Sequence, residues 1–176
     1  MAIQPLSYEN AGPAKDVFDK IKGKIGKVPH IYAAMGHSPA ALKALLSFKE
    51  NLSQGSLSGK EAEAIALIIG QINDCGYCQA AHTVMAKGAG WSEEETVALR
   101  RGQGPDDKIQ ALIDLAREIV EKDGRPGPQT VQRFLEAGYD QAALTEVIAY
   151  VSLNIFTNYF NHIADTEMDF PEPPAV

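Results

Sequence analysis

The chain has little cysteine and little positive charge. Its 176 residues include only two cysteines, Cys75 and Cys78. A pair so close in sequence does not staple distant segments, which excludes the disulfide framework of small secreted domains. Lys and Arg number 16 against 23 Asp and Glu, and the formal net charge is −7. This balance argues against nucleic-acid and anionic-membrane partners, because both are bound through basic surfaces.

Long hydrophobic runs are also missing. The most apolar segments, residues 62–72 and 142–156, both contain polar residues. Each is shorter than the roughly 20 apolar residues of a membrane span. Residues 1–5 contain no basic region followed by an apolar run, so we expect no signal peptide. These features predict a cytoplasmic protein, and in that reducing compartment a close cysteine pair is more often redox-active or metal-binding than structural.

Helical periodicity is present almost everywhere, because apolar residues recur at spacings of three and four. The length suits one domain, at roughly 100–200 residues per domain. We therefore predict a single all-α domain over residues 1–176, with an N-terminal arm at 1–12 and a proline-rich C-terminal arm at 167–176. The domain should contain about seven or eight helices. The expected ranges are 14–24, 39–52, 58–73, 76–87, 92–101, 106–122, 129–137 and 140–166.

The residues that could carry chemistry gather where one of these helices begins. Cys75 and Cys78 lie one turn apart, and His82 follows Cys78 by four residues on the same face. Unpaired amides and partial positive charge in a first helical turn stabilise a thiolate, and a nearby imidazole can take its proton. Glu63, in the preceding helix, can face His82 if the two helices form a hairpin. A carboxylate behind an imidazole fixes its tautomer, so these four residues are the candidate catalytic site.

Other interpretations of these residues stay open. Cys75 and Cys78 could be buried structural cysteines beside a satisfied core histidine. A zinc site could use both cysteines with His82 and a distant residue such as His162, although no second closely spaced ligand pair supports it. Asn158 and His162 belong to a polar stripe, with Asn154, that recurs every four residues along an apolar helix. Such a stripe faces a cavity, a subunit interface or solvent, which makes Asn158 and His162 weaker pocket candidates.

The motif E-x(11)-C-x-x-C-x-x-x-H formed by Glu63, Cys75, Cys78 and His82 resembles the AhpD-like alkylhydroperoxidases of the carboxymuconolactone decarboxylase superfamily. The resemblance implies a thiol-dependent peroxidase in antioxidant defence. In that cycle Cys78 would attack the peroxide, Cys75 would resolve the product as a disulfide, and His82 with Glu63 would relay protons. Decarboxylase members of the superfamily lack the cysteine pair, so lactone decarboxylation is not expected.

Two flanking segments extend the resemblance over about residues 20–170. Residues 26–32, GKVPHIY, and 158–162, NYFNH, are similar to the peroxidase-related subgroup of the superfamily. The resemblance implies an all-helical AhpD-like fold with the cysteine motif at the start of a helix in a helical hairpin. It also implies a homo-oligomer, often a trimer or hexamer. A dithiol protein or small thiol would serve as reductant, and the cycle would need no metal, flavin or haem.

The chain departs from the best-known peroxidase of this superfamily at Tyr77, where that enzyme has a histidine in its proton relay. Tyr77 could donate a hydrogen bond to a bound peroxide or simply cover the site. Two further functions remain as alternatives. One is a general thiol–disulfide oxidoreductase without peroxide specificity, and the other is a non-catalytic helical oligomer that binds a small ligand.

Overall fold

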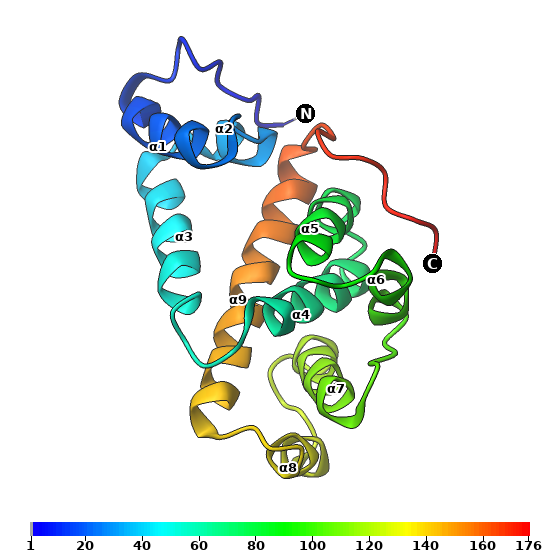
Figure 1. The fold of residues 1–176 in the computed structure, drawn as a ribbon. Coiled ribbons are helices and arrows are strands. Elements are labelled where there is room, and N and C mark those ends of the chain that lie inside the picture. Colours follow the sequence, from blue (N-terminus) through cyan, green and yellow to red (C-terminus); the bar gives the residue numbers. More distant parts are fainter. Residues whose placement is uncertain (1) are drawn as a thin grey trace.

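Helices make up nearly all the regular structure of residues 2–176, the part of the chain that the computed structural model describes (Figure 1). These residues form nine α-helices and one short 3-10 turn, with no strand. The elements are η1 (Gly12–Ala14), α1 (Lys15–Ile25), α2 (His30–Met35), α3 (Pro39–Leu52), α4 (Gly59–Ile72), α5 (Gly76–Gly88), α6 (Glu93–Arg100), α7 (Asp107–Glu121), α8 (Pro128–Glu136) and α9 (Gln141–Ala164). The prediction of an all-α fold is confirmed.

The helix missing from the prediction is α2. It begins directly after Pro29, whose backbone is extended, and ends at Met35 before Gly36. Six residues are too few for a spacing pattern to be recognised, and an isolated helix of this length is not stable in water. Four of its six residues are buried, so packing against the rest of the chain stabilises it.

The long helix α9 runs through the middle of the molecule (Figure 1). It packs against α4, α7, α3, α5 and α2, and α4 in turn packs against α5, α6 and α7. The fully buried side chains of this centre are large and apolar, which is what a stable single core requires. They include Ile65, Leu67, Ile69, Leu112, Ile113, Leu115 and Val147.

A tight turn joins α4 to α5 and makes the two helices an antiparallel hairpin. Asn73 ends α4, and Asp74 adopts a left-handed conformation with φ of 50°. Asp is one of the few non-glycine residues that tolerates this conformation. The backbone N–H of Cys75 then donates to the carbonyl of Gly70 at 2.9 Å. This turn sets Cys75 at the very start of α5, beside the last turn of α4.

The C-terminal arm leaves α9 at Asp165 and continues without regular structure past α5 and α6 (Figure 1). It is held against the helices by bonds to side chains distant in sequence. Asp169 receives a hydrogen bond from Tyr77, and the carbonyl of Pro174 receives one from Arg100. Within residues 2–176, none of the helices has the length and apolar character needed to span a membrane.

Candidate active site

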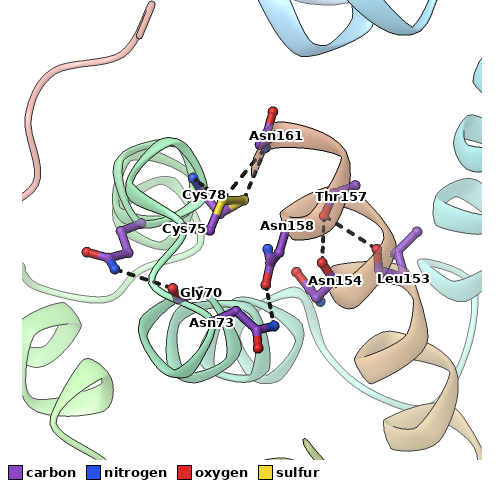
Figure 2. The surroundings of a disulfide bond; sticks show 10 residues. Gly70, Asn73, Cys75, Cys78, Leu153, Asn154, Thr157, Asn158 and Asn161 are labelled. Carbon is purple, nitrogen blue, oxygen red and sulfur yellow. Dashed lines mark hydrogen bonds between the residues drawn. A yellow bond between two sulfur atoms is a disulfide. The ribbon is translucent and has the colours of Figure 1, made fainter. Parts of the chain in front are cut away.

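Cys75 and Cys78 form a disulfide at the start of α5 (Figure 2). Cys75 is the N-cap residue, and its Sγ accepts a hydrogen bond from the backbone N–H of Cys78 at 3.3 Å. Both residues are buried. Because the two sulfurs lie at the positive end of the helix dipole, a thiolate formed there on reduction is stabilised.

Glu63 and His82 meet across the α4–α5 hairpin. Nδ1 of His82 lies 2.8 Å from Oε2 of Glu63, and each side chain is only 16% exposed. An ionised carboxylate can accept hydrogen bonds but cannot donate them, so the proton between Glu63 and His82 belongs on Nδ1. With the proton on Nδ1, Nε2 is the ring nitrogen that can exchange a proton with another group. The structure thus brings together the two residues that the hairpin hypothesis paired.

A cavity of about 490 Å³ lies beside the disulfide. Its polar members include Cys78, Glu63 and His82, whereas Cys75 is not among the described residues that line it. Most of the remaining lining is apolar or aromatic. It includes Ile25, Pro29, Ile31, Leu45, Leu57, Ala62, Ala66, Ala81, Val84, Met85, Leu153 and Phe170. Cys78 therefore borders this cavity, and the apolar lining suits an apolar molecule.

Tyr77, between the two cysteines, lines the same cavity and holds the C-terminal arm over it. Its hydroxyl donates to Oδ1 of Asp169 at 2.7 Å, and its ring packs edge-on against Phe170 at 5.5 Å between centroids. Burial and the neighbouring Asp169 carboxylate raise the pKa of Tyr77 far above its ordinary value of 10.0. The hydroxyl therefore remains protonated and is engaged by the arm.

Asp169 and Phe170 were not predicted as parts of the site. Lys27 lies 3.3 Å from Oδ2 of Asp169, and the backbone N–H of His30 donates to the same oxygen at 3.1 Å. Asp169 thus joins α5, the start of α2 and the arm at one point. The proline-rich tail has no helical or strand periodicity, so the sequence does not indicate which distant residues its side chains contact.

The residues of the polar stripe expected on α9 differ in burial: Asn154 and Asn158 are buried, whereas His162 is exposed. Asn158 is fully buried and its Oδ1 accepts a hydrogen bond from Asn73 at 2.8 Å, but it does not line the cavity. His162 is exposed and lies beside Tyr159. The residues of α9 that do line the cavity include Asn154 and Asn161. Steps of four residues drift around a helix of 3.6 residues per turn, whereas a step of seven returns to nearly the same face.

Arg100 is a second buried polar residue that the sequence did not single out. Its guanidinium donates to Gln71 at 3.0 Å, to Gln79 at 2.9 Å and to the carbonyl of Pro174 at 2.7 Å. Burial lowers the pKa of Arg100. These bonds fix α4, α5 and the C-terminal arm to α6.

Comparison with known proteins assigns the family. The model of the carboxymuconolactone decarboxylase family matches residues 27–121, which include the whole α4–α5 hairpin. The chain belongs to the carboxymuconolactone decarboxylase family. No curated protein sequence matches the chain.

Solved structures share the AhpD-like fold of this family member at low sequence identity. A peroxidase-related protein with an alkylhydroperoxidase AhpD core, from Ralstonia eutropha JMP134, aligns with TM-score 0.84 and 15% identity over 95% of this chain and 93% of its own. A peroxidase-related protein from Silicibacter sp. TM1040 aligns with TM-score 0.80 and 19% identity, covering 95% and 88%. The debrominase Bmp8 in complex with 2,3,4-tribromopyrrole aligns with TM-score 0.82 and 17% identity, covering 96% and 92%.

The geometry does not assemble the four zinc ligands considered from the sequence. His82 is bonded to Glu63, whereas His162 is exposed on the last turns of α9. Among residues 2–176, no three His, Cys, Asp or Glu side chains are grouped so as to hold a metal ion. What this family member's hairpin does bring together is a dithiol–disulfide pair and an imidazole–carboxylate pair. Such a set supports proton transfer and two-electron thiol chemistry.

Proposed function

We propose that the protein is a thiol-dependent peroxidase that reduces hydroperoxides through a Cys75/Cys78 dithiol–disulfide cycle, in antioxidant defence. One observation carries the proposal. Cys78 lines an apolar cavity that the Glu63–His82 pair also lines, and it is bonded to Cys75, which is not among the described residues that line that cavity. A nucleophile, a proton acceptor and a resolving thiol are thus available to one bound molecule.

In the first step the thiol proton of Cys78 moves to Nε2 of His82, whose positive charge Glu63 stabilises. The Cys78 thiolate attacks the outer oxygen of the hydroperoxide, so that an S–O bond forms as the O–O bond breaks. The leaving alkoxide takes the proton from His82 and departs as an alcohol. The sulfur is oxidised to a sulfenic acid, and the peroxide is reduced by the same two electrons.

In the second step the Cys75 thiol attacks the Cys78 sulfenic acid. An S–S bond forms, and the hydroxyl group leaves as water with the thiol proton. The bond between the two sulfurs in the structure supports this step, since no backbone movement is needed to join them. A dithiol protein or a small thiol then reduces the disulfide by exchange and restores both thiols.

The relay proposed here uses only Glu63 and His82. The histidine that the best-known relative carries immediately before the second cysteine is replaced by Tyr77, and the hydroxyl of Tyr77 donates to Asp169. The role supported for Tyr77 is to cover the cavity and hold the arm.

Assembly as a homo-oligomer, a trimer or hexamer, is part of the same proposal. Its support is an exposed apolar stripe on one face of α9, formed by Ile148, Phe156, Tyr159 and Ile163. Large apolar side chains aligned in this way mark an interaction surface more often than open surface. His162 lies beside this stripe, which favours the interface role among those considered for it.

The experiment that tests the peroxidase function is thiol counting on the reduced protein. Addition of tert-butyl hydroperoxide should consume both thiols with formation of one alcohol per protein, and a dithiol should restore them. If the thiols survive excess hydroperoxide while a disulfide reagent still oxidises them, the protein is a thiol–disulfide oxidoreductase without peroxide chemistry. Thiols inert to both reagents would favour the ligand-binding oligomer.

A second candidate function is thiol-dependent removal of bromide from an apolar aromatic molecule. It is favoured by the fold shared with the debrominase Bmp8 and by the apolar lining of the cavity beside Cys78. The chemistry balances, because oxidation of two thiols to a disulfide releases two electrons and two protons. The electrons and one proton convert the C–Br bond into a C–H bond and bromide, and the second proton is released. The test is to incubate the reduced protein with 2,3,4-tribromopyrrole and measure bromide release. If bromide is released faster than the protein reduces tert-butyl hydroperoxide, the debrominase function is favoured over the peroxidase function.

A further inference from the structure

Asn161 is the polar side chain of α9 that touches the reacting sulfurs. Its Nδ2 lies 3.2 Å from Sγ of Cys78 and 3.8 Å from Sγ of Cys75 (Figure 2). Asn161 is in the last turn of α9, where its backbone carbonyl accepts the hydrogen bonds that end the helix, from Asp165 and Thr166. Its position is therefore fixed by the end of a helix rather than by a loop.

The other end of the same amide has no partner. Oδ1 of Asn161 is buried and accepts no hydrogen bond from the protein, although the side chain lines the cavity beside Cys78. Buried amide oxygens are nearly always bonded, so an unbonded one calls for a ligand or a function. The group that completes it must be a hydrogen-bond donor within reach of Cys78.

We propose, on the basis of the peroxidase function above, that Asn161 is a further catalytic residue with two roles. Its amide N–H donates to the Cys78 thiolate, and its free carbonyl oxygen accepts the hydrogen bond of the hydroperoxide O–H. A hydroperoxide carries its only O–H on the oxygen that the thiolate attacks. One amide thus contacts both atoms between which the S–O bond forms, and orients the peroxide for displacement of the alkoxide.

The two roles predict separable effects. Loss of the donor destabilises the thiolate and raises the pKa of Cys78, because a hydrogen bond to the charged form favours that form. Loss of the acceptor removes an interaction with the hydroperoxide only. It therefore slows the reaction with hydroperoxide even at a pH where the thiol is fully ionised, but leaves unchanged the reaction with iodoacetamide, which has no O–H.

The test uses the full chain with Cys75→Ser, so that Cys78 is the sole thiol, with and without Asn161→Ala. We expect Asn161→Ala to raise the thiol pKa, read from the pH dependence of iodoacetamide alkylation. At a pH above both thiol pKa values, alkylation rates should match while the rate with tert-butyl hydroperoxide falls at least about tenfold. Asn161→Asp, of the same shape, should raise the thiol pKa further because it places a negative charge beside the sulfur.

Asn158→Ala is the matched control, since it removes another buried asparagine of α9 whose side chain does not line the cavity. It should leave the thiol pKa and both rates unchanged. An unshifted pKa in Asn161→Ala, or equal losses with hydroperoxide and iodoacetamide, would overturn the proposal. If the parent protein itself fails to react with hydroperoxide, the peroxidase function is wrong, and the pKa comparison still decides whether Asn161 acts on the thiolate.

Discussion

Helices α4 and α5 are neighbours in one hairpin, yet they begin in different ways. At α4 the Ser58 side chain accepts from the backbone of Glu61 while the Glu61 carboxylate accepts from the backbone of Ser58. At α5 the N-cap residue is Cys75, and its sulfur accepts a hydrogen bond from the backbone N–H of Cys78. Similar cap geometry therefore starts one helix with an oxygen and the other with a sulfur of the disulfide pair.

The difference shows how a reactive site is built on an ordinary helix start. A serine cap contributes about 1 kcal/mol to stability. A sulfur is a weak acceptor in the same position, but it is the atom that the helix dipole can activate. We therefore expect variants at the start of α4 to change stability and variants at the start of α5 to change reactivity, each without the other.

The largest effect is expected for Cys78→Ser. Serine lacks the acidity and nucleophilicity of the thiol, so hydroperoxide turnover should fall at least about a hundredfold. The protein should remain folded, because serine is close to cysteine in size and nothing else in the helix start changes. Peroxide consumption with a dithiol as reductant measures the rate, and circular dichroism the fold. Unchanged turnover would show that Cys78 is not the attacking residue.

Cys75→Ser should separate the two steps of the cycle. Serine is a preferred N-cap residue, so α5 should keep its start. The first oxidation of Cys78, followed in a single turnover by trapping of the sulfenic acid, should keep its rate. Steady-state turnover with a dithiol protein should fall at least about tenfold, since no disulfide forms. Loss of the single-turnover rate instead would assign the attack to Cys75.

Glu63→Gln should lower the reactivity of the thiol without lowering stability. The glutamine keeps the size of the side chain but no longer stabilises positive charge on His82. We expect hydroperoxide reduction to slow by about tenfold, which is less than the loss of the acid–base group itself would cause. Glu93→Gln is the control, because it removes the carboxylate partner of exposed Lys87 at the other end of α5. An equal rate for Glu63→Gln and wild type would remove Glu63 from the relay.

The serine caps should show the opposite behaviour. Ser58→Ala and Ser92→Ala each remove one capping box, at α4 and at α6. Each should lower the free energy of unfolding by about 1 kcal/mol, measured by urea denaturation, and leave the hydroperoxide rate unchanged. A change in that rate comparable with the effect of Glu63→Gln would mean that stability and reactivity are not separated in the hairpin.

The smallest effect is a pH dependence of the α4 cap. Burial alone would raise the pKa of Glu61, but hydrogen bonds from Ser58 and Tyr139 outweigh it and hold the pKa below its ordinary 4.5. A carboxyl group with a lowered pKa in the folded state contributes stability above about pH 4.5, and this is lost as pH falls through the folded value. The stability difference between wild type and Glu61→Gln should therefore narrow from pH 7 to about pH 3.5. If the stability difference between wild type and Glu61→Gln stays constant over this pH range, the pKa of Glu61 is not lowered in the folded protein.

Much of the fold could be predicted from local signals in the sequence. Ser58, Ser92 and Asp140 each cap a helix that was expected to begin there, because capping depends on residues within one turn. The pairing of Glu63 with His82 followed from the short connection between two helices, which leaves little alternative to a hairpin.

The parts that were missed depend on contacts between distant segments. Asp169, near the end of the chain, contacts Tyr77 and Lys27. Both partners are so distant in sequence that no helical spacing pattern relates them to Asp169. Asn161 was overlooked because a spacing of four residues selected His162 instead, whereas the cavity side of α9 follows a spacing of seven from Asn154. A helix of 24 residues magnifies this drift.

The disulfide closes a very short stretch of chain, three residues from Cys75 to Cys78. The loss of unfolded-state entropy on crosslinking grows with the length of the closed loop, so a bridge this short contributes little to holding the molecule together. The helices α4, α7 and α9 themselves contain no cysteine. In the proposed cycle the protein would therefore store and release an electron pair with a smaller change in its folding free energy than a bridge across a long loop would cause.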